Sequence, residues 1–215
     1  MKLLAFNMGY GKGWTSPLKY LKSRDTTAKI LSFVKRVNPD VAGLIEINVN
    51  TQLGVFEEKF RYSIASCKYS PLVHRIPLVQ NFGNAVFSNK KCKMQKRFLS
   101  AGIKRLVIEC KFSDFRLLLV HLSLEKSSRK KQIQELLRIS KKKTVIAGDF
   151  NFQDKSEMKP LIGKGLKALV KRPTFPSWNP RKSFDQVFVT PDIRAKAKVL
   201  KVRLSDHLPV LVEIK

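Results

Sequence analysis

Polar side chains that can bind metal or move protons follow short apolar runs at several places in this sequence. After Val145 and Ile146, which favour a buried strand, Gly148 can turn the chain or approach a ligand closely, and Asp149 and Asn151 then share one face. The other polar side chains of this kind are Asn7, Glu46, His121, Asp185, Asp206 and His207. A carboxylate beside a buried strand costs free energy unless it is paired or bound to metal, so this pattern predicts a functional site at strand ends.

These residue types together suit phosphate chemistry. Carboxylate and amide oxygens are ligands that Mg²⁺ or Mn²⁺ prefers and zinc does not. With histidines added, the set holds what in-line hydrolysis of a phosphodiester needs: a metal, a group that activates water and a stabiliser for the leaving oxygen. Each residue alone also has a structural interpretation. Asn7 could cap a strand, and Asp149 with Asn151 could form an Asx turn. His121 could be an ordinary core histidine, and Asp185 with His207 could be a structural pair.

The elements that must position these side chains are mainly strands. We expect strands over residues 2–8, 40–46, 83–88, 103–112, 115–124, 144–149, 183–190 and 208–214. Helices are predicted over 25–37 and after a cap at Ser127 or Ser128, and a lysine-rich turn over 89–97. Residues 48–82 are expected to contain a long basic loop, with Pro71, His74 and Pro77, that faces the substrate, and His74 is left on the surface. Hairpin and helical connections together predict a mixed sheet or a pair of sheets in a single domain over 1–215.

Charge narrows the choice of partner. The chain has 43 Lys and Arg against 16 Asp and Glu, a net charge of +27, and no acidic residue over 59–108 or 158–184. Such an excess is not needed for solubility, so a polyanionic partner explains it best: nucleic acid first, an anionic membrane surface second. A generally basic proteome or a ribosome-associated role would also produce it.

The remaining composition predicts the compartment. No apolar run approaches the roughly 20 residues that span a bilayer, and the first residues turn polar too early for a signal peptide. The odd number of cysteines (Cys67, Cys92 and Cys110) lacks metal-ligand spacing and indicates reduced thiols. We therefore expect a cytoplasmic protein that could associate with the nucleoid, with no membrane span and no obligate protein partner.

Seven segments resemble the endonuclease/exonuclease/phosphatase superfamily, the group of deoxyribonuclease I and exonuclease III. They occur in the order of that superfamily: residues 4–7 (LAFN), 43–46 (GLIE), 83–88 (GNAVFS), 120–123 (VHLS), 148–151 (GDFN), 184–189 (FDQVFV) and 205–209 (SDHLP). The resemblance implies a four-layer α/β sandwich, two packed mixed β-sheets flanked by helices. It also implies a divalent-metal-dependent hydrolase of phosphate esters.

The resemblance further implies a role for each matching position. Glu46 would bind Mg²⁺ (or Mn²⁺), with Asn7 and Asp206 completing the metal site. Asp149 would activate the attacking water, and Asn151 would hold the phosphate or the nucleophile. His207 would stabilise the phosphate transition state, with Asp185 orienting its imidazole. His121 would contact the phosphate or assist the leaving group, and Arg129 is a weaker candidate for a phosphate contact.

Charge favours one substrate class among those that this superfamily hydrolyses. A long phosphate backbone fits a +27 surface better than a small inositol headgroup, so we expect a DNA endo- or exonuclease that reads little base sequence. Abasic-site enzymes of the exonuclease III type have Gln and Lys where this chain has Ile45 and Asn48, which counts against that specificity. The alternatives are a phosphomonoesterase acting on inositol phosphates or phosphoinositides, and a catalytically silent, basic nucleic-acid-binding protein.

Overall fold

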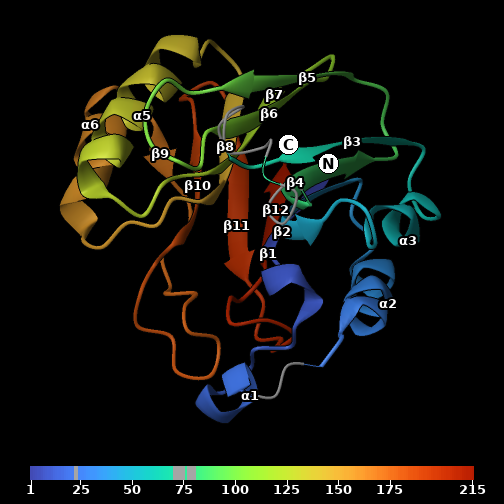
Figure 1. Cartoon of the computed structure of the whole chain (residues 1–215). Helices are drawn as coiled ribbons and strands as arrows, with labels where there is room; N and C mark the ends of the chain where they lie inside the picture. Colours follow the sequence, from blue (N-terminus) through green and yellow to red (C-terminus); the bar gives the residue numbers. More distant parts are fainter. Residues whose placement is uncertain (22–23, 70–75, 77–80) are drawn as a thin grey trace.

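The computed structural model describes residues 1–21, 24–69, 76 and 81–215, and in this part of the chain two six-stranded sheets pack face to face (Figure 1). The first sheet has the order β11-β12-β1-β2-β4-β3, and the second has the order β5-β6-β7-β8-β10-β9. Only β1 with β2 and β7 with β8 run parallel, and the other neighbouring strands are antiparallel. Both sheets are therefore mixed, as the sequence predicts.

The strand bounds of the first sheet are β1 (Lys2–Asn7), β2 (Val41–Asn48), β3 (Tyr62–Cys67), β4 (Phe82–Ser88), β11 (Ala195–Val199) and β12 (Val210–Ile214). Those of the second sheet are β5 (Lys93–Phe98), β6 (Leu106–Lys111), β7 (Arg116–His121), β8 (Thr144–Asp149), β9 (Lys167–Ala168) and β10 (Asp185–Val189). The helices are η1 (Gly9–Gly11), α1 (Pro17–Leu21), α2 (Thr27–Val37), α3 (Leu53–Glu57), α5 (Lys126–Ile139), η2 (Lys155–Met158) and α6 (Lys159–Gly163). No helix in the described part of the chain is long and apolar enough to cross a lipid bilayer.

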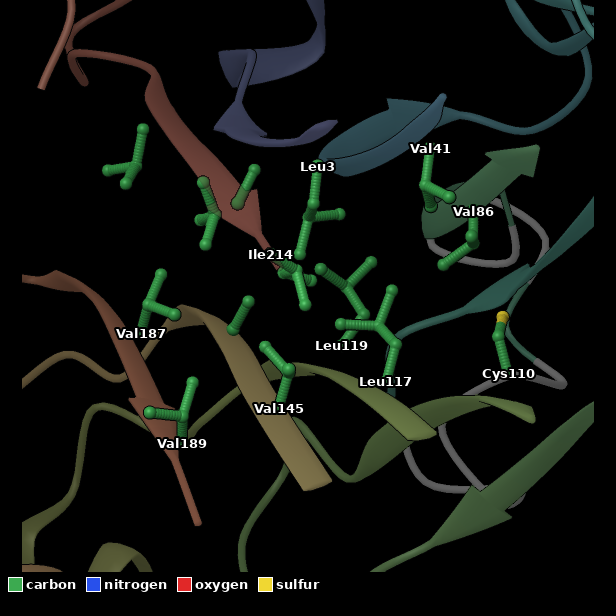
Figure 2. Packing of buried hydrophobic residues seen from close by; sticks show 14 of the residues in the cluster. Leu3, Val41, Val86, Cys110, Leu117, Leu119, Val145, Val187, Val189 and Ile214 are labelled. Atoms are coloured by element: carbon green, nitrogen blue, oxygen red, sulfur yellow. The ribbon is translucent and has the colours of Figure 1, made fainter. Parts of the chain in front are cut away.

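Three apolar clusters define four layers. The cluster between the sheets takes alternate residues from both of them, for example Leu3, Leu119 and Val145 (Figure 2). A second cluster packs α2 and α3 on the outer face of the first sheet, and a third packs α5 and α6 on the outer face of the second. This is the four-layer α/β sandwich that the family resemblance implied, so that expectation is confirmed.

The structure corrects several local predictions. The lysine-rich stretch predicted as a turn contains the edge strand β5, whose mostly exposed, charged side chains hide the strand signal. Helix α5 begins earlier than predicted, after Glu125, and the hydroxyls of Ser127 and Ser128 donate to the Glu125 carboxylate instead of capping the helix. Three further strands were missed: β3, the lysine-rich edge strand β11 and the two-residue strand β9. The prediction for His74 lies outside the described residues.

Candidate functional site

Three predicted site residues form one row across the second sheet. His121 ends β7, Asp149 ends the parallel strand β8, and Asp185 begins the antiparallel strand β10; the register pairs Asp149 with both of the others. Leu119 precedes His121 by two residues and points into the cluster between the sheets, so alternation directs His121 to the same side. The site therefore sits at one end of the inter-sheet core.

Asn7 reaches the row from the first sheet. It follows Leu3 and Ala5 on the inward face of β1, and its Nδ2 donates to Asp149 Oδ2 at 3.0 Å. Its own Oδ1 accepts the backbone N–H of Gly9 at 3.1 Å, so the amide orientation follows from both contacts. Asn7 therefore holds the central carboxylate from the opposite sheet.

A β-bulge aims Glu46. Ile45 packs in the cluster between the sheets, whereas Ile47 packs against α2 and α3 on the outer face, although regular alternation would place both on one face. The register with β4 shifts between these two residues, and Glu46 adopts a left-handed φ of 57°. Because of the bulge, β2 contributes side chains both to the cluster between the sheets and to the cluster under α2 and α3. The bulge also turns Glu46 toward the strand ends.

The turn after β8 is held by close strand packing and by hydrogen bonds of Asp149 and Asn151. Gly148 has a φ of 144°, and a Cβ there would collide with the Val120 carbonyl of β7, so glycine permits the close approach of two strands and not of a ligand. The backbone N–H of Asn151 donates to Asp149 Oδ1 at 2.9 Å, which is the Asx-type turn weighed from the sequence. Asn151 Nδ2 donates to the Leu122 carbonyl at 2.9 Å. The turn fixes Asp149 from a second side.

His207 is held as an imidazolium beside Asp185. Its Nδ1 lies 2.7 Å from Asp185 Oδ2, which also accepts the Thr174 hydroxyl at 2.6 Å, and its Nε2 lies 4.0 Å from Asp149 Oδ2. Burial by itself would lower the pKa of His207, but the Asp185 charge and hydrogen bond, with Asp149, raise it to about 10. Asp206, the neighbour in the chain, accepts the Ser205 hydroxyl at 2.8 Å.

Burial governs the charge of Asp149. The carboxylate lies almost out of contact with solvent, and burial raises its pKa although His207 and Lys104 oppose that rise. A carboxylate whose pKa moves toward neutrality is a better proton acceptor than an ordinary aspartate. The surroundings of Asp149 therefore favour its protonated form more than those of an exposed aspartate do.

His121 has a lysine as its closest polar contact. Lys104 Nζ lies 2.6 Å from His121 Nε2, which is itself 3.4 Å from Asp149 Oδ2. Burial and the Lys104 charge lower the pKa of His121 well below 6.5, so the imidazole is neutral at physiological pH. Burial and nearby Lys68 lower the pKa of Lys104 to about 8. Sequence reasoning missed Lys104, which is one of many lysines in an acid-free span.

A second lysine that sequence reasoning missed, Lys68, forms an ion pair with Glu46. Lys68 Nζ lies 2.6 Å from Glu46 Oε1, and its ammonium also faces the rings of Tyr10 and Tyr69, with centroids 5.0 and 5.4 Å away. Burial would raise the pKa of Glu46, but Lys68 and Lys104 hold it below its ordinary value. In the sequence, a carboxylate beside a buried strand indicated a bound metal, because burying its charge costs free energy. In the structure, Lys68 offsets that cost for Glu46.

The donor set still has the chemistry of a magnesium site. Glu46, Asn7 and Asp206 offer hard oxygen atoms near the same strand ends. However, Asn7 Oδ1 and Asp206 Oδ1 already accept hydrogen bonds, and Glu46 Oε1 is paired with Lys68. Among the residues that the structure describes, no three His, Cys, Asp or Glu side chains gather as metal ligands. The residues present therefore fit such an ion in donor type, provided that Lys68 yields its place.

Arg129 is not brought to this site. Its side chain is 0% exposed and forms a two-pronged ion pair with Glu157, Nε to Oε2 at 2.8 Å and Nη2 to Oε1 at 2.9 Å. Nη1 donates to the carbonyls of Ser123 and Leu124. A guanidinium with these partners ties α5 to η2 and has no open side for a phosphate, so the expected contact is replaced by a structural role.

Comparison with known proteins decides the family. The sequence pattern of the endonuclease/exonuclease/phosphatase family matches residues 4–207. The chain belongs to this family. A search of curated proteins finds no match.

Solved structures of the endonuclease/exonuclease/phosphatase fold agree with this assignment. An endonuclease/exonuclease/phosphatase from Beutenbergia cavernae is similar with a TM-score of 0.79 at 18% identity, over 100% of this chain and 71% of that one. A functionally unknown conserved protein from Enterococcus faecalis gives 0.76 at 16% identity, over 100% and 99%. A mannosyl-6-phosphatase from Bacteroides thetaiotaomicron gives 0.72 at 16% identity, again over 100% and 99%. At these identities the likeness establishes the fold, and the family is one of nucleases and phosphatases.

Proposed function

We propose that this chain is a divalent-metal-dependent phosphodiesterase that hydrolyses nucleic acid, as a DNA endo- or exonuclease. The observation that carries the proposal is the convergence of Asn7, His121, Asp149 and the His207–Asp185 pair at the end of the inter-sheet core. A buried base beside an imidazolium is the arrangement that hydrolysis of a phosphodiester requires.

Asp149 accepts the proton of the attacking water in this scheme. Asn7 and the backbone N–H of Asn151 hold its two oxygens, so the acceptor is fixed before substrate arrives. The water oxygen bonds to phosphorus, the bond to the leaving oxygen breaks, and His207 stabilises the negative charge of the phosphorane. Asp185 keeps that imidazole charged and oriented.

The leaving oxygen needs a proton. Lys104 can supply it, because its pKa of about 8 leaves the ammonium charged at neutral pH yet acidic enough to donate. His121 is neutral and positions Lys104 through the 2.6 Å contact.

Mg²⁺ or Mn²⁺ would be held by Glu46 with Asn7 and Asp206. When bound, such an ion neutralises phosphate charge and orients the phosphoryl oxygens. The protein residues then need only supply the base, the imidazolium and the acid.

Charge supports nucleic acid as the substrate. A net charge of +27 attracts a polyphosphate backbone without reading base sequence. The family neighbour that is a mannosyl-6-phosphatase favours a second candidate, a phosphomonoesterase that acts on a sugar phosphate or an inositol phosphate. A silent nucleic-acid-binding protein is the third, and the intact set of buried polar side chains speaks against it.

The test is cleavage of plasmid and of single-stranded, duplex and abasic oligonucleotides, with Mg²⁺, Mn²⁺ or chelator. Asp149→Asn removes the base, and Asp154→Asn is a matched control because Asp154 is an exposed capping residue outside the site. Metal-dependent cutting that Asp149→Asn alone abolishes supports the nuclease. If the wild type binds DNA but releases phosphate only from sugar or inositol phosphates, the phosphatase replaces it. Binding without either activity supports the silent protein.

A further inference from the structure

Lys68 is a buried cation for which no role was predicted. Its side chain is 2% exposed, and an ammonium is rarely buried so completely unless an anion pairs with it. The anion here is Glu46, at 2.6 Å, and two aromatic rings cover the rest of the ammonium.

The backbone of Lys68 is fixed where both sheets meet. Its N–H donates to the Phe82 carbonyl in the first sheet at 3.0 Å, and its carbonyl accepts the N–H groups of Arg105 and Leu106 at 2.8 and 3.3 Å beside the second sheet. With the main chain held from both sides, the side chain reaches Glu46 without any loop movement. The bulge at Glu46 supplies the other half of the contact.

An ammonium and a divalent ion cannot share Glu46 Oε1 freely. A bound Mg²⁺ or Mn²⁺ lies about 2 Å from a carboxylate oxygen, and Lys68 Nζ already lies 2.6 Å from that atom. The two like charges would stand a few ångströms apart in a site largely closed to water, where their repulsion is weakly screened.

We infer that Lys68 is an internal competitor for the metal: its ammonium occupies Glu46 until a divalent ion displaces it. The inference rests on the proposed metal site but not on the proposed substrate. It makes the wild-type site a weak binder of divalent ions, and it makes occupancy of Glu46 by metal and by Lys68 mutually exclusive.

Direct Mn²⁺ binding tests this, measured by electron paramagnetic resonance of the free ion and without any substrate. Lys68→Met keeps the length of the side chain and removes its charge, and we expect Mn²⁺ affinity to rise by at least about tenfold. Glu46→Gln should abolish the tight binding in that background, which assigns it to this site. Lys90→Met is the matched control, because Lys90 pairs with Asp40 at the exposed surface. Unchanged or weaker affinity in Lys68→Met, or no Mn²⁺ binding by either protein, overturns the inference.

A second measurement needs no substitution. Acylation of lysines in the wild-type protein, mapped by mass spectrometry, should modify Lys68 slowly without metal and at least about tenfold faster at saturating Mg²⁺, with Lys90 unaffected. Equal protection of Lys68 in both conditions contradicts displacement. Because neither measurement uses nucleic acid, a chain that binds Mn²⁺ competitively yet cuts no DNA would refute the proposed substrate and leave this inference standing.

Discussion

The His207–Asp185 pair allows the sharpest test of the proposed chemistry. Asp185→Asn keeps the shape of the side chain but removes the charge 2.7 Å from His207 Nδ1. Without that charge, Asp149 and Asp206 still oppose the effect of burial, so the pKa of His207 should fall from about 10 toward its ordinary 6.5. The interval between about 10 and 6.5 corresponds to at most roughly 5 kcal/mol of preference for the imidazolium.

The consequences can be measured on one protein. Since the chain has only three histidines, ¹H–¹⁵N spectra of the imidazole nitrogens across pH 5–11 should identify His207 as the one that stays doubly protonated until the pH approaches about 10 in the wild type. In Asp185→Asn it should lose its second proton at a clearly lower pH, and hydrolysis of bis(p-nitrophenyl) phosphate should fall by about 10²- to 10³-fold in kcat, the usual cost of losing a transition-state stabiliser.

The pH dependence of folding stability tests the direction of the His207 pKa shift independently. Because folding raises the pKa of His207, its contribution to stability is fully present below pH 6.5 and is lost as the pH rises through about 10. Urea unfolding should therefore show a decline over that interval in the wild type that Asp185→Asn lacks. A variant whose His207 still titrates near pH 10, or whose kcat is unchanged, would refute the reasoning.

Four further outcomes are expected. Asp149→Asn should lower hydrolysis of the same diester by about 10²- to 10⁴-fold with the fold intact by circular dichroism, and a smaller loss would mean that another group is the base. Lys104→Met should slow cleavage of an oligonucleotide, whose leaving oxygen needs a proton, and remove the fall in kcat expected above about pH 8, whereas an unchanged pH profile would exclude Lys104 as the acid. Arg129→Met should lower the free energy of unfolding in urea by roughly 3–5 kcal/mol, because it leaves the buried Glu157 carboxylate without its partner. Lost turnover at unchanged stability would instead support a phosphate contact by Arg129. Raising salt from about 50 to 200 mM should weaken oligonucleotide binding in fluorescence anisotropy by at least about tenfold, and a flat response would argue against backbone binding.

Local patterns predicted the core strands well because these strands are short runs of apolar, often β-branched side chains. Runs such as Leu117 to Val120 predict a buried strand, and the polar side chain that follows each run marks the end of that strand. The edge strands β5 and β11 were missed because their outward side chains are polar or charged and carry no apolar signal. Strands were therefore predictable where at least one face carries large apolar side chains, as in β12, whose Glu213 is exposed.

The residues of the candidate site also fall into those that the sequence predicted and those that it did not. His121, Asp149 and Asp185 could be named in advance, since each ends or begins an apolar run and the family motifs follow in order. The lysines could not be named, because nothing local distinguishes Lys68 and Lys104 from the other basic residues.

The sequence by itself determined which side chains stand at strand ends, because alternation is a property of neighbouring residues. Only the tertiary structure decided which charges meet. Lys68 reaches Glu46 across 22 positions and Arg129 reaches Glu157 across 28, and a bulge visible only in the register turns Glu46 to its partner. Coulomb energy depends on distance in space and on burial, and neither can be read from separation along the chain.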